Sequence, residues 1–146
     1  MIDVTALGAG TPVPPFSRVG SFATWTHFAA VNHEIADHHL DDEVARREGF
    51  PGAFAMAPLT FSYMQTMLRD WVGEQGRIVT VDIRLRSPFL RGRTLTATGE
   101  VREVHRDRDE VLVEVDVWAD DDLGTRLVQG SATVAVPAQA ADLKAR

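Results

Sequence analysis

A helical repeat of apolar side chains is the clearest pattern in the sequence, and it runs through residues 58–72. At roughly 100° per residue, the apolar side chains of this stretch fall on one continuous arc, and polar side chains fill the opposite arc. The apolar arc consists of Phe61, Met64, Met67, Leu68, Trp71 and Val72. Pro58 suits the first position of a helix, and Gly73 suits the position just after its end. The pattern therefore predicts a helix over residues 58–72 with one buried face.

A two-residue alternation of apolar and polar side chains replaces the helical repeat after Gly73. This alternation is the pattern of half-buried β-strands. It predicts strands over residues 79–85, 94–104, 111–119 and 127–136, which we expect to form an antiparallel meander. Because the apolar arc of the predicted helix is wide, the helix needs a broad partner, and a sheet wrapped around it supplies one.

The N-terminal part of the chain is less regular. The stretch GAGTPVPP at residues 8–15 is too rich in Gly and Pro for a helix or an interior strand, so we expect a surface arm over residues 1–16. The elements predicted after it are a short strand over residues 17–24, a helix over 25–31, a loop over 32–39 and a second helix over 41–48. At the other end, residues 138–146 are expected to form a flexible tail.

Composition and charge narrow the classes of protein to which the chain can belong. A length of 146 residues with 45% apolar residues predicts one soluble domain over residues 1–146. The net charge is −6 and no basic cluster is present, so nucleic acid is not an expected partner. The absence of cysteine excludes disulfides, thiolate catalysis and cysteine-bound metals. With no basic leader and no apolar run of membrane-spanning length, we expect a cytoplasmic protein without a membrane partner.

Acidic residues and histidines are concentrated in one short stretch before the predicted helix. His33, Glu34, Asp37, His38 and His39 lie close together, and they include three of the five histidines in the chain. A carboxylate and an imidazole near a helix N-terminus supply a general base, a general acid and an oxyanion-stabilising dipole. The same composition also suits a solvated loop with capping residues. A metal site is not predicted, because the spacing matches no ligand motif with a defined mechanism.

Residues 28–60 (FAAVNHEIADHHLDDEVARREGFPGAFAMAPLT) resemble the hydratase motif of the MaoC-like proteins, which include the (R)-specific enoyl-CoA hydratases and related acyl dehydratases. The family pattern has an aspartate, then Asn-Pro-x-His, x-Asp, an alanine, Gly-Phe and an Ile-Ala-His-Gly-like segment before the central helix. The matching positions are His39, Asp41, Ala45, Gly49 and Phe50. Glu34 stands at the aspartate position, ahead of His39. Residues 84–95 also resemble the family, at its strand-turn-strand segment.

The chain departs from the family pattern at several positions. Glu34 is one methylene longer than aspartate. Ala36 and Asp37 replace the Asn-Pro pair, and Met56 and Ala57 replace the His-Gly pair. The Asn-Pro pair shapes the catalytic loop of the family, so Asp37 is expected either to supply the missing polar contact or to repel Glu34. Ala57 still offers a backbone N–H, although its methyl group keeps a ligand farther away than glycine does.

The resemblance implies an α+β hotdog fold, in which an antiparallel sheet of about five strands wraps around one long helix. It also implies a hydratase or dehydratase that acts on a 2-enoyl or 3-hydroxyacyl thioester of CoA or a carrier protein. By this resemblance Glu34 and His39 are catalytic and hold a water molecule, while Ala57 and Asp37 bind the substrate. No cofactor is expected beyond the CoA or phosphopantetheine that belongs to the substrate.

Two other functions remain open, and the assembly of the chain bears on them. The altered loop is compatible with a non-catalytic or partner-dependent hotdog subunit of a heteromeric dehydratase, and other hotdog proteins are acyl thioesterases. One helix is too small to cover a sheet of about five strands, so part of the sheet and at least one edge need cover. We therefore expect a homodimer or a heteromer with another hotdog subunit.

Overall fold

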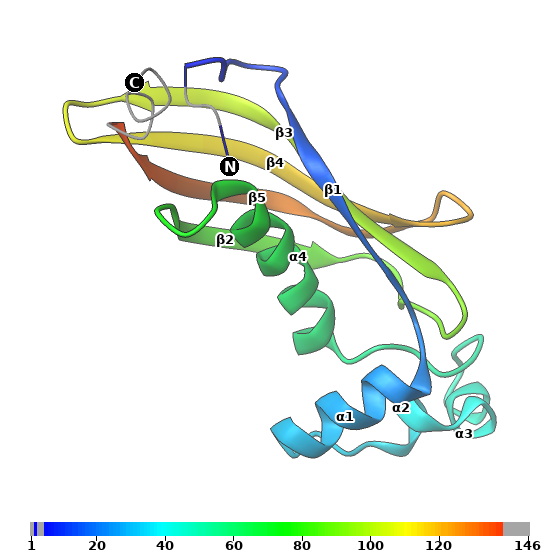
Figure 1. Ribbon diagram of the computed structural model, residues 1–146. Helices are drawn as coiled ribbons and strands as arrows, with labels where there is room; N and C mark the ends of the chain where they lie inside the picture. Colours follow the sequence, from blue (N-terminus) through cyan, green and yellow to red (C-terminus); the bar gives the residue numbers. More distant parts are fainter. Residues whose placement is uncertain (1, 3–4, 139–146) are drawn as a thin grey trace.

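Helix α4, Ala57–Val72, lies against one face of a five-stranded sheet in the computed structural model (Figure 1). The structure describes residue 2 and residues 5–138. The predicted helix is confirmed to within one residue at its start, and Pro58 lies in its first turn. Gly73 follows the helix with a φ of 73°, a value that favours glycine, and its N–H donates to the carbonyl of Arg69.

The sheet is antiparallel throughout, with the strand order β1-β3-β4-β5-β2. Its strands are β1 (Pro12–Val19), β2 (Arg77–Leu85), β3 (Thr94–Arg106), β4 (Glu110–Asp121) and β5 (Arg126–Pro137). The predicted meander is confirmed for β3, β4 and β5, but it is wrong for β2, which pairs with β5. The reason is that β1 pairs with β3 and occupies the edge that a meander would give to β2.

Strand β1 corrects the prediction for the N-terminal stretch. It begins at Pro12, so residues 12–15 of the predicted arm are part of the sheet. The strand predicted over residues 17–24 ends early, at Val19, because a helix begins shortly afterwards. Proline is compatible with β1 because this strand lies at the edge of the sheet. The predicted tail lies outside the described residues apart from Ala138.

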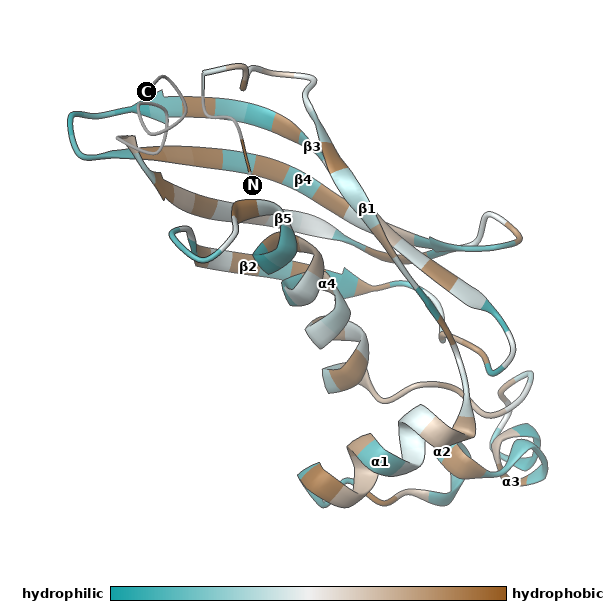
Figure 2. Ribbon diagram, viewed as in Figure 1, coloured by the Kyte–Doolittle hydropathy of each residue, from teal (hydrophilic) through white to brown (hydrophobic). Residues whose placement is uncertain are grey.

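The core lies between α4 and the sheet. Valines at alternate positions of β4 are buried, as the two-residue pattern predicts. Figure 2 shows the resulting alternation of hydrophobic and hydrophilic positions along the strands. The buried face of α4 consists of Leu59, Thr60, Tyr63, Met64, Met67, Leu68, Trp71 and Val72. Phe61, which the sequence pattern placed on this face, is only half-buried, because the buried arc is centred closer to Tyr63 and Met64.

Three short helices form a separate layer near the start of α4 (Figure 1). They are α1 (Phe22–Asn32), α2 (Asp37–Leu40) and α3 (Asp42–Arg47). We call residues 21–56, which contain them, the helical segment. The two predicted short helices are confirmed as α1 and α3 with changed bounds. The predicted loop over 32–39 is wrong at residues 37–39, which belong to α2. Among the described residues, no helix has the length and hydrophobicity needed to cross a bilayer.

Candidate active site

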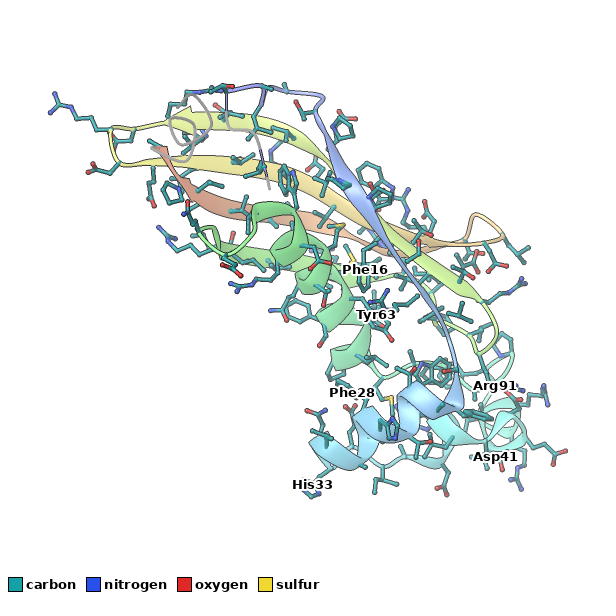
Figure 3. The ribbon with its side chains drawn as sticks, viewed as in Figure 1. Phe16, Phe28, His33, Asp41, Tyr63 and Arg91 are labelled. Carbon is teal, nitrogen blue, oxygen red and sulfur yellow. The ribbon has the colours of Figure 1, made fainter. Side chains whose placement is uncertain are left out.

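His39 is the buried histidine of the helical segment, with 7% of its surface exposed. Helix α1 ends at Asn32, and His33, its C-cap, turns the chain with a φ of 54°. The N–H of Glu34 then donates to the carbonyl of Ala29 at 3.0 Å. Helix α2 follows, and its residue His39 is buried. His33 stays on the surface at the end of α1 (Figure 3). The carboxylate of Glu34 and the imidazole of His39, which the sequence singled out, therefore both lie in the short stretch between α1 and α3.

The Nδ1 atom of His39 lies 2.8 Å from the carbonyl oxygen of Phe54. A carbonyl oxygen only accepts hydrogen bonds, so Nδ1 carries the proton of the neutral ring and Nε2 carries the lone pair. Burial lowers the pKa of His39 below its ordinary value of 6.5, and the bond to Phe54 opposes that shift. The charge of His38 also lowers this pKa, whereas Glu34 and Glu48 raise it. The balance favours a neutral imidazole whose Nε2 is unprotonated.

The other predicted site residues occupy different positions around the start of α2 and α4. Glu34 is half-buried, and its charge raises the pKa of His39, but among the described residues no hydrogen bond joins the two side chains. Asp37 is exposed in the first turn of α2, where its carbonyl accepts from the N–H of Asp41 at 2.9 Å. Ala57 is exposed as the first residue of α4. The roles predicted for these residues stay predictions.

An open pocket of about 240 Å³ lies at the start of α4. Its wall includes Phe54, Ala57, Thr60, Leu85 and Phe89. The first N–H groups of a helix have no acceptor within it, and Pro58 has no N–H, so the N–H of Ala57 is available to a ligand at the positive end of the helix dipole. Neither Glu34 nor His39 lines this pocket. Phe54 connects the two places, because it lines the pocket and its carbonyl binds His39.

Asp42 joins the helical segment to the strands. Its carboxylate accepts a hydrogen bond from the N–H of Ala53 at 2.9 Å and forms an ion pair with Arg91, which follows β2. These two bonds, with that to Arg91 the stronger, hold the pKa of Asp42 below its usual value. The guanidinium of Arg91 also lies 4.6 Å from the ring centre of Phe22 on α1. Arg91 therefore lies beside α3 and contacts two helices of the segment (Figure 3).

The sequence patterns gave no signal for Asp42, for its ion pair with Arg91 or for the carbonyl of Phe54. Asp42 and Arg91 are 49 positions apart, and no local spacing signals a contact over that distance. A backbone carbonyl leaves no trace in a pattern of side chains. Asp41, which the family resemblance matched, caps α3 by accepting from the N–H groups of Glu43 and Val44, so its contacts are structural.

One group of side chains with the spacing for a metal ion occurs among the described residues, and it lies outside this site. Glu103, His105 and Glu114 place their ligand atoms within 4.8 Å of one another on β3 and β4. Arg102 already donates to the Glu114 carboxylate at 2.7 Å, and His105 lies 3.4 Å from that carboxylate. These contacts explain the cluster as a network of surface ion pairs.

Comparisons with known proteins identify the fold. Family models and curated protein sequences give no match to the chain. Among solved structures, the (R)-hydratase from A. caviae involved in PHA biosynthesis has a TM-score of 0.80 at 22% identity, over 90% of this chain and 98% of that chain. The MaoC-like dehydratase from Rhodospirillum rubrum has a TM-score of 0.80 at 18% identity, over 94% and 97%. The ChsH1-ChsH2 complex from Mycobacterium tuberculosis has a TM-score of 0.77 at 23% identity, over 88% and 98%.

The chain therefore has the hotdog fold of the MaoC-like dehydratases and (R)-hydratases. This finding confirms the α+β fold class and the fold that the sequence resemblance implied. It agrees with the five-stranded antiparallel sheet and the long helix α4 that lies against it. One fold serves many activities, so the activity of a protein depends on the residues of its site.

Proposed function

We propose that the chain is a hydratase or dehydratase that interconverts 2-enoyl and 3-hydroxyacyl thioesters of CoA or a carrier protein. The observation that carries this proposal is the 2.8 Å contact between His39 Nδ1 and the Phe54 carbonyl, which leaves Nε2 of a buried ring unprotonated and able to accept a proton. The likeness in fold to an (R)-hydratase and to a MaoC-like dehydratase supports it. The resemblance of residues 28–60 to the hydratase motif supports it independently of the fold.

In the hydration direction, the oxygen of a water molecule bonds to Cβ of the enoyl thioester, and the π electrons of the double bond form a new C–H bond at Cα. Glu34 and Nε2 of His39 hold the water. Together they take one proton from it and return one to Cα, so no net proton is consumed. Charge that develops on the thioester oxygen is stabilised by the N–H of Ala57 at the start of α4. Asp37 is assigned to contact a polar group of the substrate.

The test follows the loss of enoyl absorbance when the purified protein is mixed with crotonyl-CoA and with longer 2-enoyl-CoA thioesters. Glu34→Gln and His39→Gln are expected to lower kcat/KM by about 10²–10⁴-fold, because each removes a general acid–base group. Glu103→Gln, on β3 outside the site, is the matched control and keeps the wild-type rate. Equal rates in the wild type and both site variants would show that the assigned pair is wrong. Release of free CoA, detected with a thiol reagent, would indicate a thioesterase instead.

A partner-dependent subunit is the second candidate, and the substitutions at Ala36, Asp37, Met56 and Ala57 favour it. Two solved structures of the same fold are complexes by name, ChsH1-ChsH2 and HadBC, both from Mycobacterium tuberculosis. In this chain the edge strand β2 exposes Val79 and Leu85, at 44% and 48%, so an apolar edge is open to a second hotdog subunit. Activity that appears only when a co-purified hotdog chain is added would support this candidate.

A further inference from the structure

His38 is an imidazole next to His39 that the proposed mechanism does not use. Its Nδ1 lies 2.8 Å from Oε2 of Glu48, and since a carboxylate only accepts, Nδ1 is the donor. Its ring stacks on the ring of Phe54, with the centres 5.2 Å apart and the planes 4° apart. The ring of His39 lies at 74° to it, with the centres 4.3 Å apart. His38 therefore contacts both the proposed catalytic imidazole and the residue whose carbonyl binds it.

Glu48, which binds His38, is itself held in place at the end of α3. It is the C-cap of α3, where its N–H donates to the carbonyls of Val44 at 3.1 Å and Ala45 at 3.2 Å. The bond from His38 to the Glu48 carboxylate consequently ties α2 to the end of α3. Because Glu48 sits on backbone that is already hydrogen-bonded, it can restrict the rotation of the His38 ring.

We propose that Glu48 and His38 form a positioning pair that holds Phe54 and keeps His39 with its proton on Nδ1. This inference rests on the proposed function for its catalytic meaning, but the geometry that it describes is independent of any substrate. The ring of Phe54 is stacked on His38, and the carbonyl of Phe54 is the acceptor for His39 Nδ1. A Phe54 that is free to move would weaken that acceptor and let the proton shift to Nε2, which would remove the base that the reaction needs.

The electrostatic surroundings of His39 are consistent with this role. Charged groups reach it from three places: Glu34 on the connection before α2, His38 on α2 itself, and Glu48 at the end of α3. Losing His38 removes a group that lowers the pKa of His39, and losing Glu48 removes one that raises it. The pair therefore influences the proton on His39 by both position and charge.

The first test reads the His39 tautomer directly by ¹⁵N NMR on the full-length protein, with His39→Gln used to assign the resonance. In the wild type, Nδ1 is expected to carry the proton. In Glu48→Ala and in His38→Phe, which keeps an aromatic ring, the population with the proton on Nε2 is expected to rise. Glu103→Gln, which alters the comparable contact beside His105, is expected to change nothing at His39. An unchanged tautomer in both variants would overturn the proposal. If His38→Phe does not fold, Glu48→Ala alone decides, because Glu48 is exposed and its substitution disturbs packing little.

The second test measures the reaction. Because neither residue is placed against the substrate, Glu48→Ala and His38→Phe are expected to lower kcat by about 10–100-fold with little change in KM, and to shift the pH profile. Glu48→Asp, which restores a carboxylate, should recover part of the loss. A tautomer change without wild-type turnover of any thioester would support the positioning pair and refute the proposed function. Turnover by the wild type, with an unchanged His39 tautomer in the variants, would support the proposed function and refute the positioning pair.

Discussion

The sheet with α4 and the helical segment are held together by different interactions. The sheet and α4 share a core of buried apolar residues, such as Val113, Val115 and Met64. The helical segment has few fully buried side chains and is held by directional contacts, such as those of Asp42 and of His39. Apolar burial is non-directional, whereas a hydrogen bond fixes the position of particular atoms. The difference explains how a stable scaffold can carry a site whose geometry depends on a few polar groups.

The two regions meet at an apolar contact. Trp25 of α1 is fully buried, and its ring lies 6.2 Å from that of Phe22 and 6.1 Å from that of Phe89, which follows β2. These rings are packed edge to face, the preferred geometry for aromatic pairs. Burial therefore attaches the segment to the scaffold, and the polar contacts then set its internal geometry. Substitutions in the two regions should therefore have different effects on stability and on the geometry of the site.

A cavity in the scaffold should have the largest effect on stability. Met64 is fully buried on α4, so Met64→Ala is expected to lower the free energy of unfolding by about 2–5 kcal/mol. Urea denaturation measures this change. The tautomer of His39 should stay as in the wild type, because the polar contacts of the segment are untouched. A loss no greater than that of a surface substitution would contradict the role of Met64 in the core.

Breaking the bond between Asp42 and Ala53 should loosen the segment and leave the sheet intact. Asp42→Ala is expected to speed hydrogen exchange at the Ala53 amide by about tenfold, since a hydrogen bond to a charged group is lost. Amides in the centre of β4 should exchange at the wild-type rate. Asp122→Ala, which removes an ion pair with Arg93 on the strand side, is the matched control. Equal acceleration at β4 and Ala53 would show that the two regions open as one unit.

Acid should destabilise the helical segment through His39 before it affects the sheet. The pKa of His39 is lower in the folded protein than its ordinary value of 6.5, so the unfolded segment binds the proton more tightly. The contribution of neutral His39 to folding stability is therefore complete above pH 6.5. It is lost as the pH falls from 6.5 through the lowered pKa of the folded protein. Hydrogen exchange at the amides of α2, corrected for the intrinsic pH dependence of exchange, should show protection that falls over this pH range. His39→Gln should remove this pH dependence of protection. If the dependence is unchanged in that variant, another group causes it.

An exposed apolar residue of the segment should contribute least. Val31 is 79% exposed at the end of α1, so Val31→Ser is expected to change the free energy of unfolding by no more than about 0.5 kcal/mol. Val113→Ser, at a fully buried position of β4, is the matched contrast and should cost several times as much. Similar losses at the two positions would mean that the surface of α1 is covered in solution.

Local periodicity was sufficient to predict α4 and the strands after it, because the period of a helix or a half-buried strand is set by the backbone of a single stretch. The resemblance added the hotdog fold and directed attention to Glu34 and His39. The first strand was misplaced because prolines argue against an interior strand, and only the assembled sheet shows that β1 lies at an edge. The pairing of β2 with β5 had no local signal either, because the order of strands is set only when the whole sheet is assembled.

The tertiary structure alone decided which groups meet at the helical segment. The Phe54 carbonyl, Arg91 beside Asp42, and Glu48 beside His38 are brought there by the folding of separate stretches, and no spacing in the chain encodes those contacts. The tautomer of His39 follows from one of them, since a carbonyl can only accept. The sequence by itself therefore determined α4 and the strands after it, because these depend on repeating local burial, and its resemblance to a known family implied the fold. The protonation geometry of the candidate site depends on single distances between atoms, and these exist only once the chain is folded.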